Sequence, residues 1–299
     1  MNYLLHLLIY FDIYAILALS LNLVVGYCGL LTFAHAGYYA IGGYVASLLM
    51  IVSGWGFMQA LLAGSLLTAV ASLTLSLTAW RLRGDLFVIA SLAMQSLIFS
   101  LLNNWFSFDS PLGSWNNMTN GPDGLSGIPV PTIFEWEINS RFSFAILATV
   151  LAFICGFVIN QLTSSPWGRL LLSMRDDELA TRALGKNTRI AKVQAFAIAS
   201  IFAAISGTLY SSYVRYIDPT SASLSENILV LSMVIVGGLG NFRGPLIGAA
   251  VLVGFPELLR FLELPDDQAA NIRLLMYGFL LVLLMHLRPQ GIAGDYRIK

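Results

Sequence analysis

Apolar runs of about twenty residues recur along the chain, and they restrict its fold more than any other feature. The hydrocarbon core of a bilayer is about 30 Å thick, and roughly 20 apolar residues of helix cross it. The alternating ten-residue strands that are typical of transmembrane β-barrels are absent from the sequence. Because 57% of the 299 residues are hydrophobic and 11% are charged, we expect an all-α, polytopic transmembrane helical bundle.

The apolar runs predict about nine spans, within a range of eight to ten. The candidate spans cover residues 3–25, 30–52, 57–80, 86–103, 142–163, 193–214, 226–240, 246–262 and 272–287. The run at 226–240 is the shortest and carries Glu226 near one end. A half-helix, as in transporters with discontinuous spans, is therefore an alternative for it. The polar segments between the spans are too short for a separate soluble domain, so we expect one domain, 1–299.

The basic residues are distributed unevenly between the two sides that these spans define. Twelve of them fall on one side: Arg81, Arg83, Arg169, Arg175, Arg182, Lys186, Arg189, Lys192, Arg243, Arg288, Arg297 and Lys299. The other side has four: Arg141, Arg215, Arg260 and Arg273. Since cytoplasmic loops carry the excess of Lys and Arg, the amino terminus is predicted outside and the carboxyl terminus inside. Residues 104–141 then form an extracytoplasmic loop, and residues 164–192 a cytoplasmic segment.

The cytoplasmic segment is unusually polar for this chain, with nine charged residues among the 28 from 165 to 192. Its pattern predicts one short helix, with Ser173 and Asp176 spaced as a capping box and Gly185 just beyond the last turn. A helix this short is marginal alone in water. Two interpretations remain, a solvated connector or a docking helix for a cytoplasmic partner. The expected docking residues are Arg175, Asp176, Asp177, Glu178, Ala180, Ala183 and Gly185.

Glycines gather in two blocks, one in each half of the chain. Glycine costs about 1 kcal/mol relative to alanine inside a helix, so such blocks need a reason. Close helix packing is one reason, and a broken helix that lines a solute pathway is another. Gly26-x-x-Gly29 and Gly237-x-x-Gly240 each interrupt an apolar run. The candidate packing and pathway residues are Asn22, Gly26, Gly29, His35, Gly37, Gly42, Gly237, Gly238, Gly240, Gly244 and Gly248.

Several stretches in the same chain carry a family resemblance. They are "LALSLNLVVGYCGLLTFAHAGYYAIGGYVAS" (17–47), "NGPDGLSGIP" (120–129), "SPWGRLLLSMRDDELATRALGKN" (165–187), "LSMVIVGGLGNFRGPLIGAAVLVGFPELLR" (231–260) and "RPQGIAG" (288–294). Together they resemble the permease subunits of bacterial ABC importers for branched-chain amino acids. Importer permeases share a Glu-Ala-Ala…Gly signature in their cytoplasmic loop. This chain departs from it, since "ELATRALG" has Leu179 in the middle and one extra residue before Gly185.

The resemblance implies a set of partners in the bacterial inner membrane. They are a paralogous permease subunit, two cytoplasmic ABC ATPase subunits and an extracytoplasmic solute-binding protein, with the lipid bilayer around the spans. Segment 164–192 would then couple this chain to the ATPases. No cofactor is expected in the chain itself, because ATP and Mg²⁺ would be used by the ATPase subunits and no phosphate-binding loop is present. Related permeases carry urea or short amides, which are alternative solutes.

Two other functional classes are less well supported. An ion-coupled transporter would need membrane acids placed for cation coupling, and the ionisable residues inside apolar runs are few: His6, Asp12, His35 and Glu257. An intramembrane serine hydrolase is suggested only by "GLSG" at 124–127, which lies in a polar loop without a matching histidine. The two cysteines lack metal-ligand or redox spacing, so no metal site is expected. The formal net charge of zero offers no argument for nucleic acid.

Overall fold

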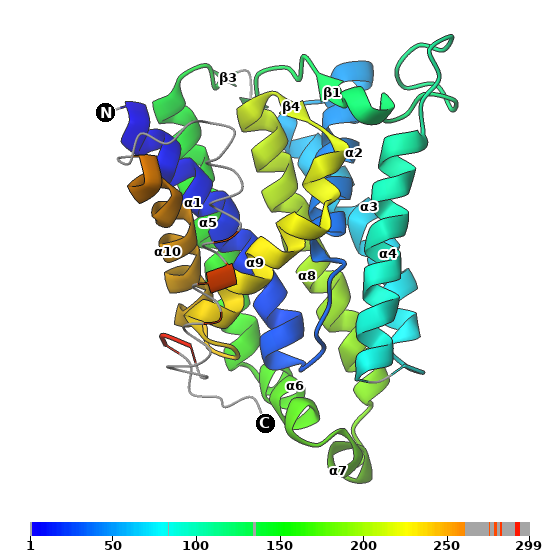
Figure 1. Ribbon diagram of the computed structural model, residues 1–299, viewed down its shortest axis with the longest axis vertical. Coiled ribbons are helices and arrows are strands. Elements are labelled where there is room, and N and C mark those ends of the chain that lie inside the picture. Colours follow the sequence, from blue (N-terminus) through cyan, green and yellow to red (C-terminus); the bar gives the residue numbers. More distant parts are fainter. Residues whose placement is uncertain are drawn as a thin grey trace.

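The computed structural model is a bundle of long helices (Figure 1). It describes residues 2–82, 84–133 and 136–260, together with residues 275, 278–279, 282 and 291–293. Within these residues, six helices are long and apolar enough to cross a membrane. They are α1 (Asn2–Asn22), which continues into a π-helix (Leu23–Tyr27), α2 (His35–Ser53), α3 (Phe57–Thr78), α4 (Asp85–Asn104), α5 (Arg141–Ser164) and α8 (Thr188–Val214). The predicted helical bundle is confirmed.

Shorter elements connect or extend these helices. The helical ones are a 3₁₀ turn (Gly121–Asp123), α6 (Pro166–Asp176), α7 (Glu178–Ala183), a second 3₁₀ turn (Pro219–Ala222), α9 (Leu224–Gly237) and α10 (Arg243–Arg260). The strands are β1 (Leu125–Ser126), β2 (Thr132–Ile133), β3 (Trp136–Glu137) and β4 (Tyr216–Ile217). Strand β1 pairs antiparallel with β4, with Leu125 opposite Ile217, and β2 pairs antiparallel with β3. These two-residue pairs are the only strands in the described residues.

Helices α1 and α8 form the centre of the bundle and carry much of its core. Ile13, Ile16 and Leu17 of α1 and Ala199 and Ala203 of α8 are almost completely buried. Helix α1 packs against α5, α8, α9 and α10, whereas α8 also packs against α2 and α3. The strands lie at one end of the bundle, and α6 and α7 lie at the other (Figure 1).

Small residues bring α2 and α8 into close contact. A Cβ on Gly42 would overlap Ala204, and a Cβ on Gly43 would lie 2.9 Å from the carbonyl oxygen of Gly207. No side chain larger than hydrogen fits at these crossing points without separating the helices. In the structure, Gly42 and Gly43 of the first glycine block thus lie at a close crossing of two helices.

The structure also defines two of the predicted spans more closely. The candidate at 226–240 is α9, whose 14 residues rise only about 21 Å. That length falls short of a bilayer core, as the half-helix alternative requires. The candidate at 30–52 begins as a helix only at His35, because residues 29–34 are irregular. Most of the candidate span at 272–287 lies outside the described residues. The same is true of the side chains of Glu257, Arg273, Arg288, Arg297 and Lys299. The count of nine spans therefore stays a prediction.

Candidate functional site

The polar segment between α5 and α8 is folded as two helices, and the prediction of a single helix was wrong. Helix α6 ends at Asp176, and Asp177 adopts an extended backbone. The Asp177 carboxylate then accepts hydrogen bonds from the backbone N–H groups of Leu179 (2.8 Å) and Ala180 (3.0 Å). Asp177 is therefore the N-cap of α7. The predicted capping box at Ser173 is also wrong, because the Ser173 hydroxyl donates to the carbonyl of Leu170 inside α6.

Gly185 ends α7 in the way that its position predicts. Its φ is 78°, in the left-handed region that favours glycine. The N–H of Gly185 donates to the carbonyl of Arg182 (2.9 Å), and the N–H of Lys186 donates to that of Thr181 (3.4 Å). This pair of bonds is the Schellman motif. A six-residue helix is thus closed at both ends by its own sequence.

Glu178 fastens α7 to the start of α8. Its carboxylate lies 2.6 Å from the guanidinium of Arg182 and 3.0 Å from the ammonium of Lys192, and it accepts a hydrogen bond from Thr188. Lys192 is almost fully buried and also donates to the carbonyl of Ala79 (3.4 Å). Burial by itself would raise the pKa of Glu178, but the hydrogen bonds and charges of Lys192, Thr188 and Arg182 outweigh it and hold the pKa below its ordinary value. Glu178 is therefore ionised at neutral pH and holds α7 in place.

The opposite face of α7 is apolar and points to solvent. Leu179 is 66% exposed and Leu184 is 81% exposed, and Ala180 and Ala183 between them are exposed as well. A helix that is fastened on one side by buried charge and presents leucines to solvent on the other has an unsatisfied apolar face. The predicted docking residues Ala180 and Ala183 belong to this face, which we call the α7 apolar face (Leu179, Ala180, Ala183, Leu184).

Arg175, at the end of α6, points away from solvent into the bundle. Its side chain is 12% exposed. Its guanidinium donates to the carbonyl oxygen of Gly26 at 2.7 Å. Gly26 lies in the π-helix that continues α1, where the ordinary helical hydrogen bonds are interrupted. The α6–α7 segment is thus bonded directly to the first of the two interrupted runs.

The second interrupted run reaches the same arginine. The turn between α9 and α10 places Gly240 so that a Cβ there would overlap Arg175 Nη1, and a Cβ on Gly29 would lie 2.6 Å from Arg175 Cγ. Asn22 ties the two runs together, since its side chain accepts from the N–H of Gly240 (3.1 Å) and donates to the carbonyl of Asn241 (3.0 Å). We call this group, Asn22, Gly26, Gly29, Arg175 and Gly240, the Arg175 junction.

The predicted residues Gly237, Gly238, Gly244 and Gly248 have a packing role in the structure. A Cβ on Gly237 would overlap the carbonyl oxygen of Gly244, and one on Gly248 would overlap that of Met233. These contacts join α9 to α10 on either side of the turn that carries Gly240. Residues 292 and 293 add to them, because their N–H groups donate to the carbonyls of Val236 and Gly237, both at 2.9 Å.

Sequence reasoning missed two buried amides that organise the centre of the bundle. Asn227, in the first turn of α9, accepts from the N–H of Ala36 (2.9 Å) and donates to the carbonyl of Phe33. Gln95, midway along α4, accepts from the N–H of Gly37 (3.0 Å) and donates to the carbonyl of Ala222. Both side chains are almost fully buried. The signal was present, since an Asn and a Gln inside strongly apolar runs need partners.

These amides satisfy helix ends that would otherwise lie unbonded inside the bundle. The first N–H groups of a helix have no partner within it. Two of those in α2, at Ala36 and Gly37, donate to Asn227 and Gln95. The same two side chains donate to Phe33, just before α2, and to Ala222, in the 3₁₀ turn before α9. The predicted residue His35 lies beside them and shares a hydrogen bond with Ser20 (2.8 Å). The starts of α2 and α9 are therefore joined to each other in the bundle interior.

The other ionisable residues of the apolar runs are satisfied separately. Asp12 accepts from Thr149 (2.6 Å), and His6 shares a hydrogen bond with Tyr213 (2.7 Å). Asp12 and His6 thus have partners on two different helices, α5 and α8.

Comparison with known proteins identifies the family of this chain. A family model described as "Branched-chain amino acid transport system / permease component" matches residues 3–285. The high-affinity branched-chain amino acid transport system permease protein LivM of Escherichia coli is 35% identical, over 94% of this chain and 67% of that protein. A probable branched-chain amino acid transport permease protein LivM of Methanocaldococcus jannaschii is 25% identical, over 97% of this chain and 92% of that protein.

A second type of permease from Escherichia coli is also similar to this chain. The permease protein LivH of Escherichia coli is 26% identical, over 96% of this chain and 92% of that protein. No solved structure matches the chain. Since the family model covers nearly the whole chain and the interrupted, glycine-rich helices lie within it, the chain belongs to the permease component family of branched-chain amino acid transport systems.

Proposed function

We propose that this chain is one permease subunit of an ATP-driven importer that carries branched-chain amino acids across the bacterial inner membrane. Its partners would be a paralogous permease subunit, two ABC ATPase subunits and an extracytoplasmic solute-binding protein. The similarity to both LivM and LivH supports a paralogous pair. ATP and Mg²⁺ would be bound by the ATPase subunits alone.

The Arg175 junction is the observation that carries the coupling part of the proposal. When the ATPases close on ATP, they would move the α7 apolar face and, with it, α6. Arg175 bonds α6 to Gly26 and lies against Gly240. A displacement of α6 therefore acts on the π-helix of α1 and on the α9–α10 turn together. Because packed interfaces switch between discrete arrangements and deform little, such a pull would reorient the interrupted helices as a unit.

Uptake by the reconstituted complex tests the solute class. Proteoliposomes that contain all subunits and the binding protein would be supplied with ATP and with labelled leucine, isoleucine, valine, urea or acetamide. Under the proposal, the three branched-chain amino acids accumulate and the other two solutes do not. Accumulation of urea or acetamide without the amino acids would instead assign the complex to the related solutes.

The orientation of the chain is part of the proposal and can be tested by labelling. The 104–141 loop and the α6–α7 segment lie at opposite ends of the bundle, which supports their placement on opposite sides of the membrane (Figure 1). Asn116 and Lys186 are both exposed, and the native Cys28 and Cys155 are buried. We expect an impermeant maleimide to label Asn116→Cys in intact cells and Lys186→Cys only after lysis. The reverse pattern would invert the topology.

The docking role of the α7 apolar face is tested by adding a charge to it. Ala183→Glu would place a carboxylate in the contact with the ATPase, where desolvation without a partner is costly. We expect this variant to insert normally but to lose the ATPases in a pull-down from detergent. Ala183→Ser, which keeps the residue small and uncharged, should retain them. Equal recovery of the ATPases with both variants would mean that the segment is a connector.

A further inference from the structure

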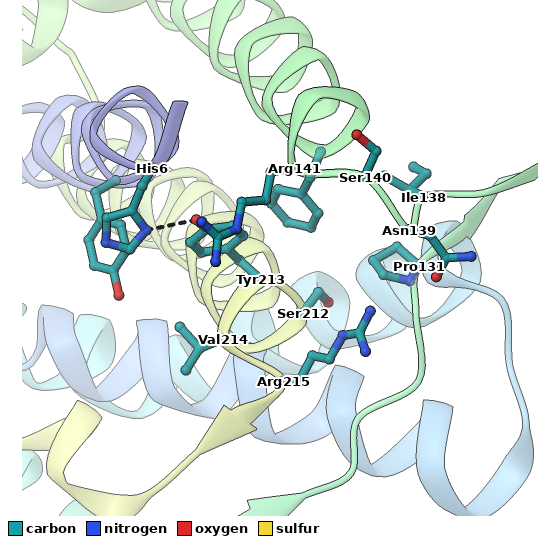
Figure 2. A pocket seen from close by; sticks show the side chains of 12 residues that line it. His6, Pro131, Ile138, Asn139, Ser140, Arg141, Ser212, Tyr213, Val214 and Arg215 are labelled. Carbon is teal, nitrogen blue, oxygen red and sulfur yellow. Dashed lines mark hydrogen bonds between the residues drawn. The ribbon is translucent and has the colours of Figure 1, made fainter. Parts of the chain in front are cut away.

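A cavity of about 440 Å³ opens at the end of the bundle opposite α6 and α7. Its walls come from the starts of α1 and α5, the end of α8, and Pro131, Ile138 and Asn139 of the loop (Figure 2). Small-molecule sites in proteins are typically about 300–1,000 Å³, so the cavity has the size of a site for one small solute. Neither the Arg175 junction nor the buried amides contribute to it.

Positive charge converges on this cavity. Arg141 enters from the first position of α5, and Arg215 enters from the residue that follows α8 (Figure 2). Neither guanidinium forms an ion pair with an acidic side chain of the described residues. Ser140, at the start of α5, is also in the wall, so the positive end of a 24-residue helix faces the same space. Two unpaired arginines and a helix amino terminus favour an anionic ligand.

A buried hydroxyl supports this conclusion independently. Ser212 lines the cavity and is 2% exposed, yet its Oγ has no hydrogen-bond partner in the described structure. An unsatisfied polar atom in such a place costs free energy unless a ligand meets it. Three residues further along, Arg215 has a φ of 59°, a backbone conformation that is rare for a residue with a side chain. Arg215 is the C-cap of α8, and helices commonly end with one residue in this left-handed conformation.

The rest of the wall is mixed, and it includes His6 and Tyr213, which share a hydrogen bond at 2.7 Å. Pro131, Ile138, Phe144 and Val214 line it, and Asn139 and Tyr10 add neutral hydrogen-bonding groups. We propose that the cavity is a binding site for a small apolar amino acid, whose carboxylate is held by Arg141, Arg215 and Ser212 and whose side chain contacts the apolar wall. This inference rests on the proposed function and deepens it, since it gives the permease a solute site of its own at the predicted outer end.

Equilibrium binding to the assembled complex tests this site. The complex, in lipid nanodiscs and without the binding protein, would be titrated with labelled leucine and then with three competitors. 4-Methylpentanoate keeps the carboxylate and the side chain but lacks the ammonium, leucinamide lacks the carboxylate, and acetate lacks the side chain. We expect 4-methylpentanoate to compete, leucinamide to fail, and acetate to compete only weakly. Competition by leucinamide as strong as that by leucine would overturn the carboxylate assignment.

Substitutions in the cavity wall test whether leucine binds in this cavity. Arg141→Gln and Arg215→Gln should each weaken leucine binding about tenfold or more, because hydrogen bonds to charged groups are among the strongest in proteins. Ser212→Ala should weaken it less. Arg81→Gln, an exposed arginine distant in sequence, is the matched control and should bind as wild type. Thermal melting of each variant separates weak binding from poor folding, and Arg141→Lys and Arg215→Lys provide charge-preserving replacements if a glutamine variant does not assemble.

The outcomes separate this inference from the proposed function. Normal ATP-driven leucine uptake with no leucine binding to the complex alone would overturn the inference and leave the function standing. Glutamine variants that bind leucine normally but no longer associate with the binding protein would assign the arginines to protein docking and would also overturn it. Failure of the wild-type complex to take up any branched-chain amino acid would instead remove the proposed function.

Discussion

Replacing Arg175 with alanine is expected to lower ATP-driven uptake about tenfold or more, while the ATPase subunits remain attached. Arg175 contributes a charge-assisted hydrogen bond to the Gly26 carbonyl at 2.7 Å from a largely buried position. Hydrogen bonds to charged groups contribute about 1.5–3 kcal/mol, and about 1.4 kcal/mol corresponds to a factor of ten. The substitution removes a side chain that bonds α6 to the first interrupted run and lies against the second, so ATPase motion would be transmitted to them poorly.

Three measurements distinguish a lost connection from a damaged fold. Pull-down of the ATPases should be unchanged for Arg175→Ala, because the α7 apolar face is intact. The ATPase rate of the complex should persist without a matching rate of uptake, which is the mark of uncoupling. Arg169→Ala, which removes an exposed arginine from the same helix, is the matched control. Wild-type uptake by Arg175→Ala would show that coupling passes through other contacts.

Replacing Gly244 with leucine is expected to prevent stable assembly of the complex. A Cβ at this position would overlap the carbonyl oxygen of Gly238 and lie 3.1 Å from the carbonyl carbon of Gly237. These are backbone atoms, so α9 and α10 would have to separate before any side chain fits. Overpacking of this kind costs about 1–3 kcal/mol or more, a large part of the margin by which a protein stays folded.

Gly254→Leu is the matched control for that experiment, because it adds the same side chain to the same helix. A Cβ at Gly254 meets no atom of the described residues within 4 Å. We expect Gly254→Leu to be recovered from detergent in amounts close to wild type, whereas Gly244→Leu is degraded or elutes without its partner subunits. Equal recovery and uptake for the two variants would show that the α9–α10 contact tolerates separation.

The Arg175 junction and the buried amides join different helices at two different depths in the bundle. At the end near α6, Arg175 and Asn22 connect the interrupted runs to each other and to α6. Deeper in the bundle, Asn227 and Gln95 connect the starts of α2 and α9 to each other. A movement at the first level must therefore either carry the second level with it or break its hydrogen bonds. This arrangement supports alternating access by the interrupted helices as a group.

The helical bundle was predictable from the sequence, for a reason that lies in the bilayer. Backbone groups have no water to bond inside hydrocarbon, so long apolar runs can satisfy them only as helices. The uneven distribution of basic residues predicted a topology in the same way. Gly185 was placed correctly beyond α7 because a left-handed residue is needed there and glycine supplies it at little cost. Each of these inferences depends on neighbouring residues or on the solvent alone.

Interactions between distant segments were not predictable in this way. The capping box expected at Ser173 does not form, because α6 continues to Asp176 and the extended Asp177 caps α7 instead. Nothing local indicates that Arg175 bonds to Gly26, 149 positions away, or that Gln95 and Asn227 complete the start of α2. The sequence by itself therefore determined that the long apolar runs become helices and that Gly185 ends α7. Only the tertiary structure decided which interruptions meet, because those contacts depend on how helices far apart in the chain pack together.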